Sequence, residues 1–338
     1  RIGPAICYEA LYSDHFAGFV REGAEIMAVI SNDGWWGNTP GHKRLFDFCK
    51  LRAIETRRSI ARSANTGISG FISSRGDIYG DILEWDKRGA LTEDMELRDD
   101  MTFYVRHGDP IYDPDSLTPL GHRQAEAVAH RLCAHGVSQV FSSSSNRAML
   151  TAQPTCEILK QEKTILDWCN ESHAWADFAI PLDETGRRTW DFAHPALQEA
   201  YASREMADLG DRWYEHPAIR DYHFERGDDR IRREAHALLA EHGYEYDPEK
   251  RMYKAVRPNK DRIALFAHQG FGLSFLSCIL DIPRPVFCTR FDMSHSGMTV
   301  IQFDENKEYV VPKILTMAND SHLYREGLPT NYQNQLRF

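Results

Sequence analysis

Three apolar segments of this chain each end in arginine or histidine residues and lead into a helical pattern. The segments span residues 101–105, 138–142 and 262–267. The residues that follow them are Arg106 and His107, Arg147, and His268. Strands that alternate with helices form parallel sheets, and the carboxyl ends of such strands meet at one edge, where α/β proteins bind ligands. The pattern therefore predicts an α/β fold that gathers these side chains at one site.

The remaining elements extend this alternation. The C-terminal part is expected to form helices at 119–134, 146–160 and 271–280, and further strands at 163–168, 298–303 and 308–315. An aromatic-rich, mostly helical region is expected at about 173–258. The N-terminal part is expected to form strands at 2–7, 25–31, 60–64 and 68–73, with helices at 13–24 and 42–59. The charged stretch 84–100 has the composition of a linker between two layered α/β pieces.

Charge, cysteine content and hydropathy exclude several classes of function. The net charge is −10, with 13 Lys and Arg against 14 Asp and Glu in residues 1–98 and 27 against 36 in the remainder. This acidity argues against a nucleic-acid surface, which requires a basic stripe. The seven cysteines contain no C-x-x-C pair, which indicates reduced thiols rather than a zinc site or a disulfide framework. No segment reaches the ~18 uninterrupted apolar residues of a membrane span.

The residue types at the strand ends suit a phosphomonoester. Planar guanidinium groups hold phosphoryl oxygens in bidentate fashion, and a neutral imidazole can attack phosphorus. The neighbouring arginines should disfavour the imidazolium form of His107 and keep this side chain nucleophilic. The helix at 119–134 opens with Thr118, Pro119 and Gly121, and backbone N–H groups at such a helix start point at anions. No metal is required, and no clustered Asp, His or Cys spacing indicates one.

Four sequence blocks occur together in a characteristic order. They are "YVRHGD" with "LTPLGHRQA", "SSSSNRAMLTA", "FAHQGFG" and "SHSGMTVIQF". Through these blocks residues 101–338 resemble the histidine phosphatase superfamily, whose other well-known branch is phosphoglycerate mutase. The resemblance implies a three-layer α/β/α domain over 99–338 with a helical cap inserted at about 173–258. It also implies metal-independent hydrolysis of a small phosphorylated substrate through a phosphohistidine, without a cofactor and in the cytoplasm.

The resemblance assigns roles residue by residue. His107 would be the nucleophile, Arg106 and Arg147 would clamp the phosphoryl oxygens, and His268 would donate to the transferring group. Glu171 would protonate the leaving alcohol, with Asp177 and Glu184 as alternatives and a solvated helix-start carboxylate as the non-functional interpretation of Glu171. The further substrate-binding candidates are Thr118, Gln269, Gly270 and His295.

The aromatic residues of the insert allow two interpretations. Trp175, Trp190 and Trp213 are expected mainly to form a small core that stabilises the cap. Alternatively, some of these rings roof the pocket and select the substrate. Four scattered arginines of the insert could help to bind an acidic substrate, although charges on helical surfaces are usually only solvated; these four are Arg187, Arg188, Arg204 and Arg212.

The first hundred residues carry a second pattern. In "GPAICYEALYSDHF", Cys7 is expected at the end of an apolar strand, immediately before a turn and a helix, and such a turn can expose a thiolate near backbone N–H groups. With "ISNDGWWG" and "LRAIETRRSIARSANTGISGFISSRGDI", residues 1–108 resemble the nitrilase-like domain of apolipoprotein N-acyltransferase, an enzyme of the bacterial inner membrane. The resemblance implies that residues 1–98 are the C-terminal half of that α/β sandwich. Cys7 would then be its nucleophile and Glu9 a nearby acidic helper.

In that family the catalytic Glu and Lys lie upstream of the Cys, so we expect this segment to be catalytically inactive. The chain opens on Arg1 inside an apolar run, from which we expect residue 1 to be a truncation. "MTFYVRHGD" fits both resemblances, which favours an artificial chimera over a natural fusion. Three further functions stay open: a mutase that uses the same residues behind a lid, an acyltransferase fragment, and a binding module without catalysis.

Overall fold

The computed structural model describes residues 1–22, 24–93, 95, 101–257, 259, 261–303 and 308–332 of the chain. It divides into two compact units, Arg1–Asp99 with Ala134–Gly136, and Asp100–Cys133 with Val137–Phe338. The predicted boundary between residues 98 and 99 lies outside the described residues. So do residues 94 and 96–100 of the predicted linker. The boundary therefore stays a prediction.

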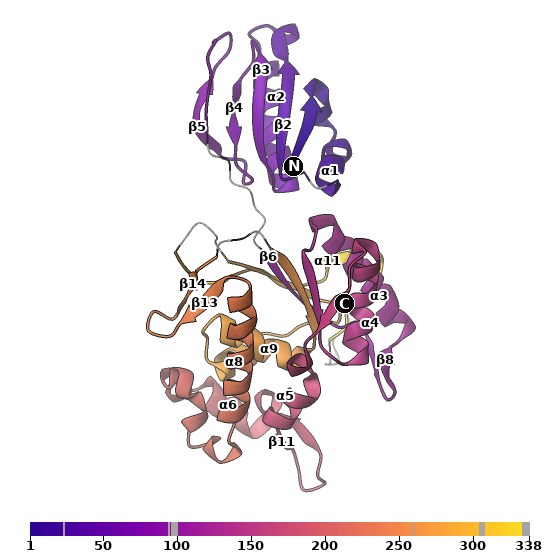
Figure 1. Cartoon of the computed structure of the whole chain (residues 1–338), viewed down its shortest axis with the longest axis vertical. Coiled ribbons are helices and arrows are strands. Elements are labelled where there is room, and N and C mark those ends of the chain that lie inside the picture. The colour runs from indigo at the N-terminus through magenta and orange to yellow at the C-terminus, as the bar shows by residue number, and fades with distance from the viewer. Residues whose placement is uncertain are drawn as a thin grey trace. The chain divides into compact units, whose positions relative to one another are not determined.

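The first unit is a five-stranded mixed sheet with helices (Figure 1). Its strands are β1 (Ile2–Ile6), β2 (Ile26–Asn32), β3 (Ser59–Asn65), β4 (Ser69–Ile72) and β5 (Ile78–Leu83). The first three strands are parallel and the last two are antiparallel to their neighbours. The helices are α1 (Ser13–Arg21) and α2 (Pro40–Thr56), with 3₁₀ turns at Cys7–Leu11 and Asp33–Trp36. The fifth strand was not predicted, because its sequence, "IYGDIL", contains glycine and aspartate, which are depleted in strands.

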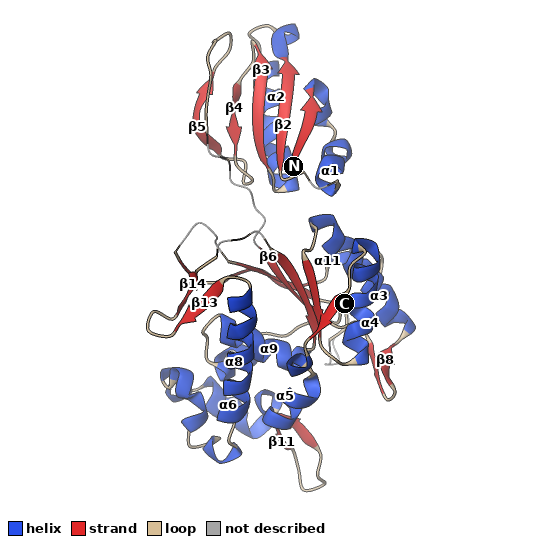
Figure 2. Ribbon diagram, viewed as in Figure 1, coloured by secondary structure: helices blue, strands red, loops and turns tan. Residues whose placement is uncertain are grey.

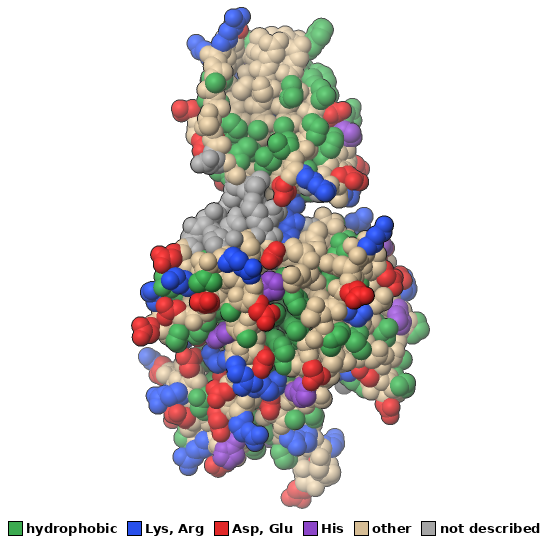
Figure 3. Space-filling view, viewed as in Figure 1, with side chains coloured by type: hydrophobic (Ala, Val, Ile, Leu, Met, Phe, Trp, Pro, Cys, Tyr) green, Lys and Arg blue, Asp and Glu red, His purple; other side chains and the backbone are tan. Residues whose placement is uncertain are grey.

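Helices α1 and α2 cover one face of this sheet. Met27 and Val29 of β2 pack in one cluster with Phe16 of α1 and with Phe46 of α2. Alternate residues of a strand point to opposite faces. Ile2, Ile6 and Ile30 accordingly remain 64%, 62% and 60% exposed. Figure 3 shows apolar side chains gathered on the surface of this unit. The first unit therefore presents an apolar surface to its surroundings.

The second unit is built on a six-stranded sheet of order β10-β9-β15-β6-β16-β18. Its strands are β6 (Met101–Arg106), β9 (Gln139–Ser142), β10 (Lys163–Ile165), β15 (Arg262–Ala267), β16 (Met298–Gln302) and β18 (Lys313–Asn319). The four strands β10, β9, β15 and β6 are parallel. The strand β16 is antiparallel to β6 and to β18. The predicted parallel arrangement of the three site-bearing strands is present.

Helices cover both faces of this sheet (Figure 2). They are α3 (Pro119–His135), α4 (Asn146–Leu159), α5 (Glu171–Phe178), α8 (Glu225–Glu241), α9 (Gln269–Ile279), α10 (Arg284–Cys288) and α11 (Ser321–Arg325). Phe103 and Val105 of β6 pack with Val128 of α3 and Ala152 of α4. Tyr104, which points to the other face, packs in a cluster with Phe275 of α9. Because both faces are buried, the centre of the strand, residues 103–105, is continuously apolar. These layers confirm the predicted α/β/α class.

The insert between β10 and β15 contains more than helices. Two short helices, α6 (Gln198–Ala202) and α7 (Arg204–Asp208), accompany α8. Two antiparallel strand pairs also belong to the insert: β11 (Ala179–Pro181) with β12 (Arg188–Trp190), and β13 (Tyr244–Asp247) with β14 (Met252–Ala255). β14 also pairs with β17 (Tyr309–Val310). A further hairpin, β7 (Pro110–Tyr112) with β8 (Asp115–Leu117), was not predicted. Among the described residues, no helix is both long and apolar enough to cross a membrane.

Candidate active site

Backbone hydrogen bonds align the ends of the parallel strands. The amide of His107 donates to Ala267 O at 3.0 Å, and the amide of Ser143 donates to Phe266 O at 2.9 Å. The residues that follow β6, β9 and β15 therefore emerge side by side at the carboxyl edge of the sheet. Arg147 reaches the same place from the first turn of α4, which begins at Asn146.

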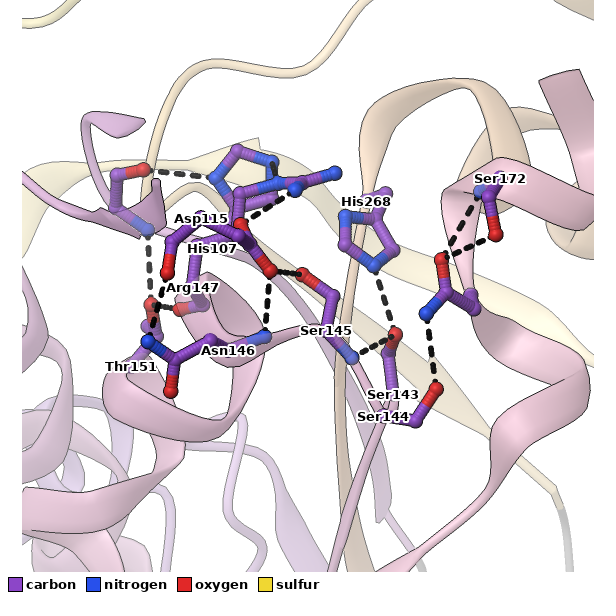
Figure 4. A network of polar contacts seen from close by, with 12 residues as sticks. His107, Asp115, Ser143, Ser144, Ser145, Asn146, Arg147, Thr151, Ser172 and His268 are labelled. Carbon is purple, nitrogen blue, oxygen red and sulfur yellow. Dashed lines mark hydrogen bonds and ion pairs between the residues drawn. The ribbon is translucent and has the colours of Figure 1, made fainter. Parts of the chain in front are cut away.

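The His107 side chain is held in one orientation (Figure 4). Nδ1 lies 2.8 Å from Gly108 O, and Arg147 Nε donates to Nε2 at 3.3 Å. Since a carbonyl can only accept, Nδ1 carries the hydrogen and Nε2 has the lone pair. Burial lowers the pKa of His107 well below its ordinary value, and the charges of nearby His268, Arg106 and Arg147 add to this effect. The imidazole is thus neutral at pH 7, and burial contributes more than the predicted effect of the arginines.

The loop after His107 lies very close to the start of α3. A Cβ at Gly108 would lie 2.6 Å from the carbonyl oxygen of Gly121, closer than real Cβ atoms approach. The amide of Gly108 donates to Thr151 Oγ1 at 3.0 Å. A glycine is therefore needed here to bring the loop, and the carbonyl that orients His107, against the helix.

Arg106 and His268 have buried nitrogens that find no hydrogen-bond partner among the residues that the structure describes. One Arg106 nitrogen, Nη1, donates to Met293 O, but Nε and Nη2 have no hydrogen-bond partner. His268 Nε2 lies 2.8 Å from Ser143 Oγ, while its Nδ1 is unpartnered. The rings of His107 and His268 are 5.2 Å apart. Buried donors without partners are costly, so a bound anion would remove a penalty that the protein otherwise carries.

Asp115, which sequence reasoning missed, holds Arg147 in place. Its Oδ1 accepts from Arg147 Nη1 at 2.6 Å, and its Oδ2 accepts from Ser145 Oγ at 3.0 Å and from the amide of Asn146 at 2.7 Å (Figure 4). Although partial burial opposes it, the hydrogen bond from Arg147 holds the pKa of Asp115 below its ordinary value. The β7–β8 hairpin therefore anchors the guanidinium beside His107.

Glu171 is not a solvated carboxylate. Its two oxygens accept from the amides of Gly270 and Phe271, both at 2.9 Å, at the start of α9. Burial raises the pKa of Glu171, against the opposite effect of these two hydrogen bonds. Asp177, an alternative acid, instead pairs with Arg230 at 2.6 Å. Glu184 is exposed in the loop between β11 and β12.

The other predicted substrate-binding residues are distributed around this centre. Thr118 Oγ1 donates to Asp109 Oδ2 at 2.8 Å and accepts from the amide of Gly121 at 3.0 Å, so it caps α3. Gln269 Nε2 donates to Asp292. His295 is buried with its ring 6.0 Å from that of His107, and burial lowers its pKa to about 3.

A cavity of about 670 Å³ opens beside His107. Its walls are Arg106, His107, Tyr112, Asp115, Ser145, Arg147, Asn170, Glu171, Ser172, Trp175, Trp190 and Gln269. Thr118, Gly270, His268 and His295 do not line it. Trp213, by contrast with Trp175 and Trp190, is fully buried in the cap. Of the two interpretations of the insert, the core one describes Trp213 and the pocket one describes the other two tryptophans.

In the first unit, Cys7 is the first residue of the 3₁₀ turn that follows β1, and its backbone is left-handed, with φ of 53°. Ser31 Oγ lies 3.8 Å from its sulfur and donates to Asp33 Oδ1 at 2.5 Å. Glu9 accepts from the amide of Ile6 at 2.7 Å. The thiol therefore sits on a tight strand-to-helix turn, as the sequence predicted.

The second unit can now be assigned to a family. The family model for the histidine phosphatase superfamily (branch 1) matches residues 103–314. The chain belongs to the histidine phosphatase superfamily, and this membership supports a phosphatase-type activity for the second unit.

Solved structures that resemble the chain include three phosphatases. A phosphoserine phosphatase mutant from Entamoeba histolytica, in complex with phosphoserine, is 15% identical to this chain, with a TM-score of 0.42. The match covers 66% of this chain and 98% of that chain. A mycobacterial glucosyl-3-phosphoglycerate phosphatase with VO3 has 18% identity, 64% and 98% coverage, and a TM-score of 0.41. The alpha-ribazole phosphatase of Shigella flexneri has 17% identity, 65% and 96% coverage, and a TM-score of 0.41. The family membership follows from the match over 103–314 and not from these likenesses.

The first unit matches a different family. The carbon–nitrogen hydrolase model covers residues 1–99. Apolipoprotein N-acyltransferase of Chlorobaculum tepidum is 38% identical over 111 residues, which are 33% of this chain and 21% of that protein. The enzyme of Geobacter metallireducens is 33% identical over 109 residues, 32% of this chain and 21% of that protein. The chain thus spans about a fifth of the length of these relatives, and the predicted nitrilase-like resemblance of the first unit is confirmed.

Proposed function

We propose that the second unit hydrolyses phosphomonoesters through a phosphohistidine at His107, without a metal. The observation that carries this proposal is the oriented, neutral imidazole: Nδ1 is bonded to Gly108 O at 2.8 Å, and Nε2 faces Arg147 at 3.3 Å. A neutral imidazole with its lone pair directed at a guanidinium is ready to attack a phosphorus atom whose oxygens that guanidinium binds.

In the first half-reaction, the phosphoryl group of the substrate lies against Arg106 and Arg147. The unpartnered Nε and Nη2 of Arg106 donate to its oxygens, and Arg147 Nε turns from His107 to the same group. We infer that Ser143 Oγ donates to Nε2 of His268, from which it lies 2.8 Å away, and that the Nδ1–H of His268 is then a further donor. His107 Nε2 forms the new N–P bond as the P–O bond to the leaving group breaks.

Glu171 supplies the proton that the leaving alkoxide requires. Its raised pKa favours the acid form, and the amides of Gly270 and Phe271 stabilise the carboxylate that remains after transfer. In the second half-reaction this carboxylate takes a proton from water, which attacks phosphorus while the electron pair of the N–P bond returns to His107 Nε2. Phosphate leaves, and both residues regain their starting protonation states.

A pulse with a phosphate ester labelled at phosphorus tests the proposal. Acid-labile, alkali-stable label is expected on the protein, with EDTA present, and is expected to vanish in His107→Ala. The control is His130→Ala, because His130 is an exposed histidine on α3. Label that persists in His107→Ala, or activity that EDTA removes, would contradict the proposal.

For the first unit, we propose that Cys7 carries no acyltransferase activity in this chain. Within residues 1–22 and 24–93, the side-chain hydrogen-bond partner of the Cys7 thiol is the hydroxyl of Ser31, which is not a base at neutral pH. One oxygen of Glu9 accepts from the amide of Ile6 at 2.7 Å, and the other lies 3.6 Å from Nε2 of His15. Incubation with a labelled phospholipid should therefore leave Cys7 unacylated, and a thioester on Cys7 would refute this proposal.

A further inference from the structure

Three aromatic side chains line the cavity next to the phosphate-binding groups. Trp175 of α5 and Trp190 of β12 meet edge to face, with ring centres 5.0 Å apart at 89°. Tyr112 of β7 also lines the cavity, and its ring lies 5.3 Å from the guanidinium of Arg147. Trp175 is 36% exposed, so part of its ring surface is open to a ligand. These rings form an aromatic wall, which we define as Tyr112, Trp175 and Trp190.

The positive charges on the described walls of the cavity belong to the two arginines that face the phosphoryl position. Among the described residues that line it, the cations are Arg106 and Arg147, and both face the position of the phosphoryl group. The other charged lining residues are the carboxylates Asp115 and Glu171. No arginine of the insert is among the described residues that line the cavity. The four that were considered as ligands of an acidic substrate have other partners: Arg187 pairs with Asp183, Arg188 with Ala179 O, Arg204 with Asp208 and Arg212 with Glu215. A carboxylate or second phosphate on the substrate would therefore meet aromatic and acidic groups.

The backbone of α9 makes room for this wall. A Cβ at Gly270 would lie 2.3 Å from Cζ2 of Trp190. Gly270 therefore lets the indole lie directly over the first turn of α9, where Glu171 is bound. The ring is thereby held within reach of the leaving group, whose oxygen Glu171 would protonate.

We propose that the aromatic wall binds the leaving group, and that this group is an uncharged aromatic ring. This inference rests on the proposed function for the place of the phosphoryl group. Aromatic rings stack or meet edge to face with rings of a ligand, while the polar side chains of Asn170 and Ser172 on the cavity wall can bond neutral substituents. Esters that carry a carboxylate or a second phosphate are disfavoured.

Binding of non-hydrolysable phosphonates separates this inference from turnover. Isothermal titration calorimetry of the full chain would compare 4-carbamoylbenzylphosphonate with 4-carboxybenzylphosphonate, which have nearly the same shape and differ in charge. We expect the carboxamide to bind about tenfold more tightly, because the second anion lies near two carboxylates and no free cation. Equal affinity, or tighter binding of the carboxylate, would overturn the proposal.

Variants of the wall test its contribution. Trp175→Leu should weaken the binding of 4-carbamoylbenzylphosphonate by about two- to tenfold, the range of one aromatic pair, and leave the binding of methylphosphonate unchanged. Trp175→Phe should restore most of the affinity for 4-carbamoylbenzylphosphonate. The matched control is Trp35→Leu, since Trp35 is 82% exposed and does not line the cavity. If Trp175→Leu and Trp175→Phe both bind the carboxamide as the unaltered chain does, the wall does not bind the leaving group. Failure of the labelling experiment alone would refute the phosphohistidine and not this binding preference.

Discussion

Replacing Glu171 by Gln should slow hydrolysis according to the basicity of the leaving group. The amide keeps the size of the side chain but has no proton to transfer at neutral pH. General acids typically contribute 10²–10⁴-fold, which corresponds to about 2.7–5.4 kcal/mol of transition-state stabilisation. For an alkyl phosphate we expect a loss within this range.

Glu171→Gln should also lower the free energy of unfolding, separately from its effect on catalysis. The two carboxylate oxygens accept from the amides of Gly270 and Phe271. Glutamine has one acceptor oxygen, and its NH₂ would face the other amide. One buried amide then loses its partner, at a cost of about 1–3 kcal/mol in the free energy of unfolding. A modest drop in melting temperature is therefore expected even where catalysis is unaffected.

The assay is kcat/KM for an alkyl phosphate and for p-nitrophenyl phosphate, whose leaving group needs no proton. The pH profile adds a second measure. Because burial raises the pKa of Glu171, the acid form persists above the usual carboxyl range, and activity falls as pH rises through that raised value. In Glu171→Gln this descending limb should disappear. If both esters lose activity equally, Glu171 is not the acid.

Three further outcomes are expected. Asp115→Asn should lower kcat/KM by about 10–100-fold, because a charge-assisted hydrogen bond to Arg147 of about 1.5–3 kcal/mol is weakened. A kcat/KM within twofold of that of the unaltered chain would show that Asp115 does not position Arg147. The ascending limb of kcat/KM against pH, corrected for substrate ionisation, should lie below pH 6.5, because the lowered pKa keeps His107 neutral there; a limb at or above that pH would contradict the neutral nucleophile. A chain that begins near Leu97 should melt cooperatively and keep the activity of the full chain. Residues 1–98 alone should be insoluble or unfolded because one face of their sheet exposes apolar side chains. Stable folding of residues 1–98 alone would refute this prediction.

The central strands and the residues after them could be predicted from the sequence for a physical reason. β6 and β15 are buried on both faces, so they contain continuous apolar runs, at 103–105 and 263–267, that stop where the site begins. Arg106, His107 and His268 directly follow these runs. A residue at the end of a parallel strand has its position fixed by the sheet, and a local pattern is enough to place it.

Asp115 could not be predicted in this way. It belongs to a three-residue strand in a short hairpin, and nothing near it distinguishes it from the other acidic residues of the chain. Its function comes from contacts with Ser145, Asn146 and Arg147, about 30 positions further along. Contacts at such separation depend on how the hairpin folds onto α4, which no local pattern records.

The environment of Glu171 was also beyond local reasoning. The sequence places it in the first turn of a helix, where a carboxylate is commonly solvated. The amides that bind it belong to α9, 99 and 100 positions later. The tryptophans of the insert show the same limit, since Trp190 lines the cavity and Trp213 is in the core although both lie in similar aromatic stretches.

The hydrogen bond from His107 Nδ1 to Gly108 O has a consequence for the fate of the proposed intermediate. Histidines of many sites are oriented by a carboxylate, which can draw the proton away from the ring. A peptide carbonyl is far too weak a base to do so, so the proton stays on Nδ1 when Nε2 carries the phosphoryl group. The imidazole then departs as a neutral ring rather than as an anion. In the proposed mechanism, a main-chain partner would therefore make His107 a good leaving group as well as a nucleophile, and would favour rapid release of the phosphoryl group over its storage on the protein.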